Sequence, residues 1–241
     1  MSSKVYLKVR RVAQDLVERA REVSVADIHE AMGPQGRSAL MGARMRPIRE
    51  GQPKIAGPAV TAQCWPGDNL MMHRALYLAQ PGDVLVVVCQ AELSGAQWGD
   101  MAGRYAKQKG LAGVVVQGCV RDVDQLREIG LPVWSTHIWP IHPDKSGHGL
   151  VNAPVVCEGA LVRPGDLIVA DSDAVVCVPR DGAAGVLDAA QARMHKEDAG
   201  AERVRAGTSV WELSGAAESY ARLAGVEEID AAFDDGALAA R

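Results

Sequence analysis

The segment that decides the fold is residues 81–122, PGDVLVVVCQAELSGAQWGDMAGRYAKQKGLAGVVVQGCVRD. After a Pro-Gly-Asp turn, residues 84–89 form an apolar, largely β-branched run, which is typical of a strand buried on both faces. Helix formers occupy 100–109 and end at Gly110, a residue favoured at helix C-termini. A second buried-strand pattern covers 111–116. Strand, helix and strand in this order predict a right-handed parallel crossover.

Two charged loops flank this crossover. Asp100 stands at the start of the helix, and after twenty further residues Arg121-Asp122 follows the second strand and a Gln117-Gly118 break. In open α/β sheets, ligands bind at the edge where the carboxyl ends of parallel strands meet. We therefore expect two carboxylates and one guanidinium to reach the same small ligand. The simpler alternatives are an N-cap role for Asp100 and a solvated ion pair for Arg121-Asp122.

These residue types suit the binding of pyruvate as its enolate. Neighbouring carboxylates can hold a hard divalent cation through oxygen atoms and water, and such a cation polarises a carbonyl group. Arg121 can stabilise the enolate oxygen with charge-assisted hydrogen bonds. The amides of Met101, Ala102 and Gly103 lack partners inside the helix, and they favour an anion such as the carboxylate of a 2-oxo acid.

On these residues the chain resembles the class II pyruvate aldolases of the RraA-like family, which is named after the regulator of ribonuclease E activity. These aldolases cleave 4-hydroxy-4-methyl-2-oxoglutarate and 4-carboxy-4-hydroxy-2-oxoadipate, and they carry Asp, twenty residues, then Arg-Asp, as Asp100, Arg121 and Asp122 do here. The resemblance extends over most of the chain. It includes GPAVT at 57–61, PGDN at 66–69, PGDVLVV at 81–87, QGCVRD at 117–122 and PGDLIVAD at 164–171.

The resemblance implies an α/β fold, a swivelling β/β/α domain of the RraA-like type with flanking helices. A single domain would span 1–241, with an N-terminal helical extension over about 1–50 and a C-terminal helical tail over about 207–241. Hydrophobic periodicity predicts helices over 9–20 and from Gly182 to about Arg205. The other patterns predict a short helix opened by Ser24, a strand over 54–64, a helix over 68–79, loops with short strands over 131–157 and two strands within 161–178.

By position, the resemblance also implies the roles of the metal-site residues. Asp122 would anchor the divalent metal, and Asp100 would hold the water bound to it. Mg²⁺ is the expected ion, and Mn²⁺ or Co²⁺ would suit the same oxygen ligands. In these aldolases a glutamate from the neighbouring subunit completes the water network, and Glu197 is the candidate here. The alternative is that Glu197 is an exposed helical side chain.

The substrate site implied by the resemblance lies beside the metal. Arg121 would bind the 2-oxo group and stabilise the enolate. Gly99, Met101 and Ala102 form the predicted substrate-binding segment, in which amides of the last two hold the pyruvate carboxylate. His73 and Arg74 approach the anionic substrate in one interpretation and are surface helix residues in the other.

The implied function is cleavage of a 4-hydroxy-2-oxo dicarboxylic or tricarboxylic acid to pyruvate and a second 2-oxo acid. The resemblance also implies oxaloacetate decarboxylation as a side activity, a place in the degradation of aromatic compounds, and a trimer or hexamer with the site near a subunit interface. Two alternative functions remain: a dedicated oxaloacetate decarboxylase and a regulator that binds a ribonuclease. The regulators lack the acidic residue at the position of Asp100. A phosphohistidine domain is disfavoured because no Gly-rich segment leads to a suitable histidine.

Composition agrees with a globular enzyme. The chain has 241 residues, 48% of them hydrophobic and 23% charged, and a net charge of -4, which gives no support to a nucleic-acid partner. No apolar run approaches the length of a membrane span, and the first residues lack a signal-peptide core. Five cysteines, without a CxxC pair, argue against a disulfide framework, so we expect a cytoplasmic protein.

Other reactive side chains carry weaker hypotheses. Cys119 lies next to the predicted site, where a nucleophilic role is the less favoured alternative to a small buried hydrophobe. His137, His142 and His148 lie in or beside a loop rich in Pro and Gly. Their spacing is poor for zinc without companion cysteines, so we expect them to face the substrate or a subunit contact instead.

Overall fold

The computed structural model describes residues 2–230 and 232. The chain divides into two compact units, Met1–Met194 and His195–Arg241. The strands are β1 Lys4–Val5, β2 Arg46–Pro47, β3 Ile55–Cys64, β4 Val84–Cys89, β5 Ala96–Trp98, β6 Gly113–Val120, β7 Val133–Ile138, β8 Gly149–Val151, β9 Val155–Cys157, β10 Ala160–Val162, β11 Leu167–Ala170 and β12 Val175–Val178. The α-helices are α1 Gln14–Glu22, α2 Val25–Ala31, α3 Gly36–Ala39, α4 Leu70–Leu78, α5 Asp100–Lys109, α6 Val123–Ile129, α7 Ala183–Arg205, α8 Val210–Leu213 and α9 Ala216–Ala221.

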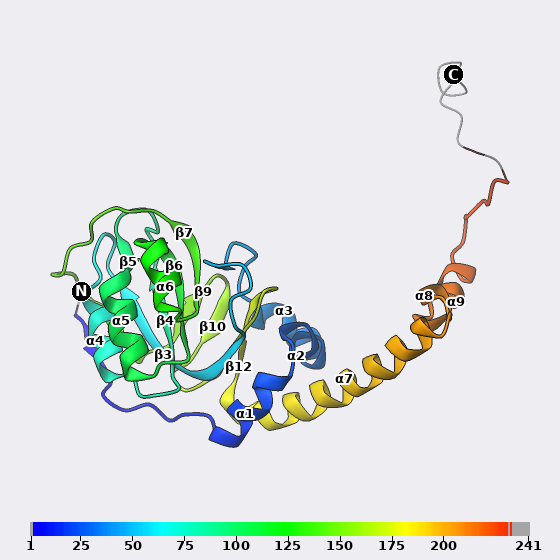
Figure 1. Cartoon of the computed structure of the whole chain (residues 1–241), viewed down its shortest axis with the longest axis horizontal. Coiled ribbons are helices and arrows are strands. Elements are labelled where there is room, and N and C mark those ends of the chain that lie inside the picture. Colours follow the sequence, from blue (N-terminus) through cyan, green and yellow to red (C-terminus); the bar gives the residue numbers. More distant parts are fainter. Residues whose placement is uncertain (1, 231, 233–241) are drawn as a thin grey trace, which may run out of the picture. The chain divides into compact units, whose positions relative to one another are not determined.

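Parallel strands form the centre of the larger unit (Figure 1). The main sheet of the described residues runs β1-β8-β3-β4-β6-β7-β2, and β3, β4, β6 and β7 are mutually parallel. Antiparallel strands β8 and β2 flank this parallel core. The β11–β12 hairpin joins the sheet through antiparallel pairing of β11 with β3. This arrangement confirms the predicted mixed α/β class.

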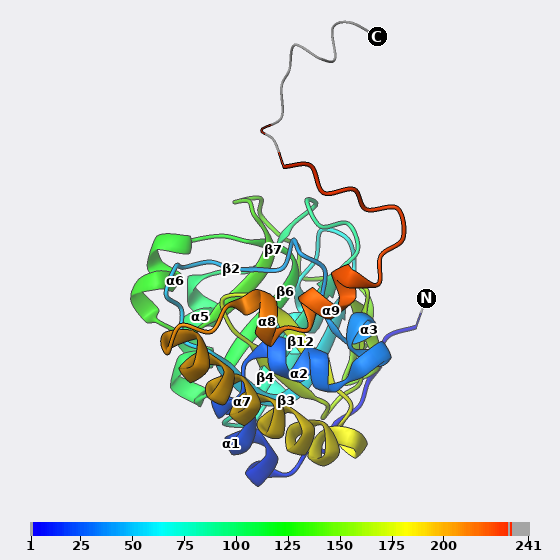
Figure 2. The same ribbon diagram turned by 90° about the vertical axis from the view of Figure 1, so that its right-hand side faces the viewer.

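The side chains of the central strands divide between two hydrophobic layers, which explains why their sequences are apolar throughout. In β4, Leu85 and Val87 pack against α4, α5 and α6. Val84, Val86 and Val88 point the other way, toward β9, β10, β11 and β12. Helices α1, α2 and the first turns of α7 cover the outer side of the β11–β12 hairpin (Figure 2). The order of layers is therefore helix, sheet, sheet, helix.

The predicted crossover is present as β4, α5 and β6. Helix α5 spans Asp100–Lys109 and ends at Gly110, whose φ of 79° is the left-handed conformation that glycine adopts readily. The prediction that the strand is interrupted at Gln117-Gly118 was wrong. Strand β6 continues through these residues to Val120, with an irregular register against β7. Strand β5 was not predicted. It pairs in parallel with the end of β6 and leads directly into α5.

Two Pro-Gly-Asp turns introduce β4 and β11 with the same hydrogen bonds. Asp83 accepts from the amide of Gln80 at 2.7 Å, and Asp166 accepts from the amide of Arg163 at 3.0 Å. The glycine before each aspartate has a positive φ, as such turns require. Both carboxylates are buried, at 1% and 2% exposure. The repeated sequence is therefore the same local turn used twice.

Arg11→Ala is expected to lower the free energy of unfolding by about 3 kcal/mol, because breaking a buried ion pair leaves one charge without its partner. Arg11 forms two hydrogen bonds of 2.8 Å to the buried Asp83 carboxylate, and these bonds raise the pKa of Arg11. Urea unfolding measures the change. Arg10→Ala is the control, because the Arg10 side chain is exposed. Equal losses in the two variants would contradict the prediction.

The second unit contains the rest of α7, followed by α8 and α9. The Ser209 hydroxyl accepts from the amide of Glu212 and caps α8. Trp211 and Tyr220 meet edge to face with ring centroids 5.4 Å apart. Among the residues that the structure describes, no helix combines the length and the apolar character needed to cross a bilayer.

Candidate active site

The end of β6, the start of α5 and the start of α4 surround a cavity of about 250 Å³ in the larger unit. The loop after β7 completes its wall. The cavity is lined by Asn69, Met72, His73, Ala96, Trp98, Gly99, Asp100, Met101, Ala102, Arg121, Asp122, Pro143 and Lys145. The structure thus brings together Asp100, Arg121 and Asp122, as their positions in the crossover predicted.

Helix α5 presents its N-terminus to this cavity. Its N-cap is Gly99, so an N-cap role for Asp100 was wrong, and Asp100 occupies the first helical position. The Asp100 carboxylate lies 3.5 Å from Arg104 Nε one turn later. Gly103 is the first residue whose amide bonds to a carbonyl of this turn, that of Gly99 at 3.0 Å. The backbone amides of Met101 and Ala102, which precede it, can therefore donate hydrogen bonds to an anion in the cavity.

Asp122 holds an unusual backbone conformation at the end of β6. Its φ of 55° and ψ of 42° place it in the left-handed region, which is uncommon for residues other than glycine. It is the N-cap residue of α6, yet its side chain caps none of that helix's amides. The carboxylate turns back toward α5 instead, and Oδ2 lies 3.4 Å from both the Asp100 amide and Arg121 Nε.

This carboxylate pair fits a hard divalent cation. Contacts of 3.4 Å lie beyond the usual range for hydrogen bonds, so lone pairs of Asp122 remain for a ligand. Within the described part of the chain, no three His, Cys, Asp or Glu side chains gather to hold a metal alone. Mg²⁺ does not need such a cage, because it usually takes one or two carboxylates and completes its shell with water and substrate. Asp122 and Asp100, which both line the cavity, would supply that minimal set.

Gly99 is required by the close approach of α5 to Arg121-Asp122. A Cβ atom added at Gly99 would lie 2.7 Å from Asp122 Oδ2 and 3.4 Å from Arg121 Cγ and Nε. The backbone of Gly99 is extended, with a φ of -158°, so the constraint is space and not conformation. Any side chain here must displace the Asp122 carboxylate.

Gly99→Ala is therefore expected to reduce catalytic turnover roughly a hundredfold, because small displacements of reacting groups have effects of that size. The folded structure should persist, and circular dichroism would check it. Gly185→Ala makes the same chemical change on α7, where an added Cβ meets no atom within 4 Å. Normal turnover in Gly99→Ala would show that Asp122 does not act from its observed position.

Two cavity residues, Lys145 and Asn69, were not predicted as site residues, although Asn69 belongs to the PGDN segment of the resemblance. Lys145 lies in an irregular loop, and Asn69 is the N-cap of α4. His73 also lines the cavity, and its approach to a substrate stays a prediction. Arg74 does not line it, and its guanidinium lies 5.3 Å from the ring centroid of Tyr77.

Glu197 does not line the cavity. It lies on α7 within the unit that begins at His195, whereas all the lining residues belong to the other unit. Its contribution from a neighbouring subunit stays a prediction.

The other reactive side chains stand apart from this cavity. Cys119 is fully buried, and burial raises the pKa of its thiol, which opposes a nucleophilic role. His137 Nδ1 lies 2.9 Å from Glu92, and His148 Nδ1 lies 3.0 Å from the Ser3 hydroxyl. All five cysteines are free thiols, as expected for a chain without a disulfide framework.

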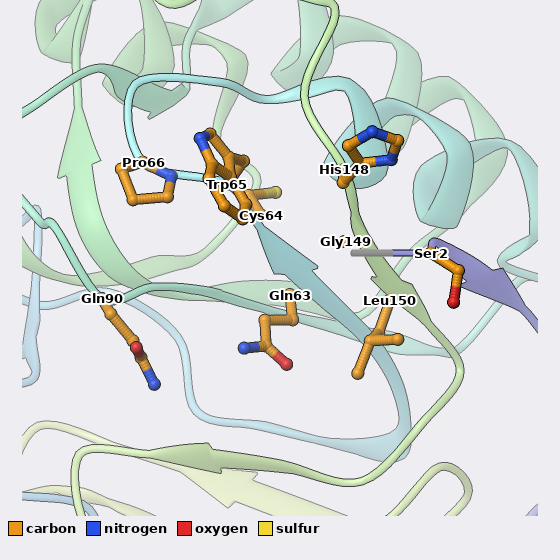
Figure 3. Close-up of a pocket in the computed structure, with 9 residues that line it drawn as sticks. All are labelled: Ser2, Gln63, Cys64, Trp65, Pro66, Gln90, His148, Gly149 and Leu150. Carbon is orange, nitrogen blue, oxygen red and sulfur yellow. The ribbon is translucent and has the colours of Figure 1, made fainter.

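A larger cavity of about 400 Å³ lies near the ends of β3 and β4 (Figure 3). Its polar groups include the Gln63 and Gln90 amides and the His148 ring, beside the half-exposed Trp65. Among the described residues, its lining includes no carboxylate side chain and no Lys or Arg. The smaller cavity, where charged groups converge, is therefore the candidate active site.

The chain belongs to the RraA-like family, because the family model described as Aldolase/RraA matches residues 25–177. A relative from Halalkalibacterium halodurans is 33% identical over 185 residues, which is 77% of this chain and 86% of that protein. A relative from Burkholderia mallei is 38% identical over 152 residues, 63% of this chain and 91% of that protein. Both carry the name "Putative 4-hydroxy-4-methyl-2-oxoglutarate aldolase".

Solved structures share the fold. RraAS2 of Streptomyces coelicolor, described as an unusual member of the RNase ES inhibitor RraA protein family, has a TM-score of 0.72 and 34% identity. The match covers 80% of this chain and 100% of that one. An uncharacterised protein of Pseudomonas syringae has a TM-score of 0.77 at 24% identity, over 85% of this chain and 95% of that one. The predicted RraA-like fold is confirmed. The family includes proteins named as aldolases and proteins named as ribonuclease inhibitors.

Proposed function

We propose that this protein is a divalent-metal-dependent aldolase that cleaves a 4-hydroxy-2-oxo dicarboxylic or tricarboxylic acid to pyruvate and a second 2-oxo acid. The observation that carries the proposal is one cavity lined by Asp100, Arg121, Asp122 and the first residues of α5. A carboxylate pair, a guanidinium and free helix amides are the groups that an enolate-forming site requires. The aldolase names of two relatives support the same class of reaction.

Each residue of the cavity has a proposed role that follows from its position. Amides of Met101 and Ala102 hold the C1 carboxylate of the substrate, and Arg121 donates to the 2-oxo oxygen. Asp122, with Asp100 acting through water, would hold the cation, whose chemistry is polarisation of the 2-oxo group. Asp100 orders the water that accepts the C4-hydroxyl proton.

Bond cleavage then follows from this arrangement. The electron pair of the C3–C4 bond moves to C3 and its carbonyl, giving pyruvate enolate, while C4 becomes the carbonyl carbon of the second 2-oxo acid. Arg121 stabilises the negative oxygen until a proton reaches C3. Oxaloacetate decarboxylation passes through the same enolate, so we propose it as a side activity.

Pyruvate release from 4-carboxy-4-hydroxy-2-oxoadipate, with Mg²⁺ and with excess chelator, tests the proposal. Rapid release that the chelator abolishes supports it. The ratio of aldol cleavage to oxaloacetate decarboxylation separates it from a dedicated decarboxylase. Absence of both reactions would overturn it.

The similarity to a ribonuclease inhibitor supports a second candidate, a regulator that binds a ribonuclease. In that case the protein should slow RNA cleavage by a purified RNase E-type enzyme, and Asp100→Ala should leave this inhibition intact. Asp100 favours the enzyme, because such regulators lack an acidic residue at this position.

A further inference from the structure

The larger cavity of about 400 Å³ is built on one face of three adjacent strands, β8, β3 and β4. Gln63 of β3 is in register with Leu150 of β8, so these two side chains lie on the same face of the sheet. Trp65 and His148 stand two residues further along each strand, directly outside its end, and Gln90 directly follows β4. The cavity thus lies at the carboxyl edge of parallel strands, where α/β sheets bind ligands.

This cavity is separate from the candidate active site. The two cavities share none of their described lining residues. Val88, which is in register with Gln63, packs in the hydrophobic layer toward β9–β12. Met72, Trp98 and Ala102 of the candidate active site belong to the other layer, with α4, α5 and α6. A ligand of the larger cavity would therefore lie on the side of the sheet that carries Val88.

The side-chain amides of Gln63 and Gln90 are available to such a ligand. Neither amide forms a hydrogen bond within the part of the chain that the structure describes, and each offers both donors and an acceptor. In Figure 3 the two side chains extend in the same direction. The His148 ring contacts the Ser3 hydroxyl through Nδ1 at 3.0 Å, which leaves Nε2 for another partner. The cavity can therefore pair with several donors and acceptors of one molecule.

The rest of the lining is largely apolar and uncharged. Trp65 is 44% exposed, so a face of its indole is open to contact, and Pro66 and Leu150 add apolar surface. Burial raises the pKa of the Cys64 thiol to about 12, so Cys64 stays neutral and acts as a small hydrophobe. No Asp, Glu, Lys or Arg stands among the described lining residues. Such walls favour a flat, neutral molecule that stacks on an aromatic ring.

The base of a nucleoside combines these properties. Every nucleobase has a π-face that stacks on aromatic side chains. A glutamine amide matches the edge of adenine with one donated and one accepted hydrogen bond. The cavity volume of about 400 Å³ lies within the range of small-molecule sites. A phosphate would find no Lys or Arg among the described lining residues, which favours a nucleoside over a nucleotide.

We infer that the larger cavity binds the base of an uncharged nucleoside, with Trp65 against the face of the base and the amides of Gln63 and Gln90 at its edge. The inference is independent of the proposed function, because no residue with a proposed catalytic role lines this cavity. It gives the chain a second ligand of a different chemical class from a 2-oxo acid.

Calorimetric titration of the whole chain with adenosine, guanosine, cytidine and uridine tests the inference. Adenosine is expected to bind most tightly, because its edge matches a glutamine amide. Trp65→Leu should weaken adenosine binding about tenfold to a hundredfold, because it removes the stacking surface. Gln63→Leu removes the amide and keeps a side chain of similar size, and it should weaken binding about threefold to tenfold. Circular dichroism would check that both variants fold.

Matched controls make the same chemical changes outside the cavity. Trp139→Leu alters a tryptophan that is 53% exposed and lines neither cavity, and Gln125→Leu alters an exposed glutamine of α6. Both controls should retain the affinity for adenosine. Absence of binding by all four nucleosides at millimolar concentration would overturn the inference, and so would equal losses in Trp65→Leu and Trp139→Leu.

Two further titrations separate this ligand from other occupants of the cavity. Tighter binding of cellobiose than of any nucleoside would assign the cavity to a sugar and overturn the inference. Tighter binding of an adenosine oligonucleotide than of adenosine would assign it to RNA and would likewise overturn the choice of an uncharged nucleoside. Adenosine binding that depends on Trp65 and Gln63, with weaker binding of both other ligands, supports it.

Discussion

Arg121→Ala is expected to reduce kcat for aldol cleavage roughly a thousandfold. Removing one donor from a preorganised oxyanion site costs about that much when charge develops in the transition state. Arg121 lines the cavity next to Asp122, where the proposed mechanism places the enolate oxygen. Steady-state pyruvate release measures the loss.

Two further variants separate charge from geometry at this position. Arg121→Lys should recover only part of the rate, because an ammonium lacks the planar fork of donors. Arg74→Ala removes an arginine whose guanidinium faces Tyr77 outside the cavity, so turnover should remain close to normal. Melting temperatures of the Arg121 variants should change little, since the side chain is about one-third exposed and its contact with Asp122 is 3.4 Å long. A rate for Arg121→Ala close to that of the unaltered protein would exclude the proposed mechanism.

The crossover that carries the site could be predicted because its signals are local. The β-branched runs of β4 and β6 and the glycine at the end of α5 mark strands and a helix without knowledge of the rest of the fold. Sequence order and the handedness of the crossover then bring Asp100 near Arg121-Asp122.

Other features depend on contacts between distant residues. Residue 99, the N-cap of α5, has no room for a Cβ atom because Asp122 Oδ2 would lie 2.7 Å from it. Lys145 reaches the cavity because Asp68, far earlier in the chain, binds the amides on one side of its loop. Neither relation leaves a pattern in the neighbouring sequence. The assignment of Glu197 rests on resemblance alone, and its test requires the assembled oligomer.

Asp122→Asn and Asp122→Ala together should separate the proposed role of this residue as a metal ligand from its backbone role. Both variants remove the anionic carboxylate, so both should abolish Mn²⁺ binding in calorimetry and reduce turnover about a thousandfold. Asn tolerates the left-handed conformation that residue 122 adopts at a φ of 55°, whereas alanine does not. The free energy of unfolding should therefore fall by about 1 kcal/mol more in Asp122→Ala than in Asp122→Asn.

The comparison is informative because the two readouts should diverge. Activity and Mn²⁺ affinity would be lost equally in the two variants, while stability would differ between them. If Asp122→Asn retained Mn²⁺ binding, the cation would have to bind elsewhere. The lack of room for a side chain at residue 99 beside the Asp122 carboxylate would then have no role in metal binding. If Asp122→Asn lost Mn²⁺ binding with unchanged stability, the strained backbone at the end of β6 would be explained as the means of directing this carboxylate into the cavity.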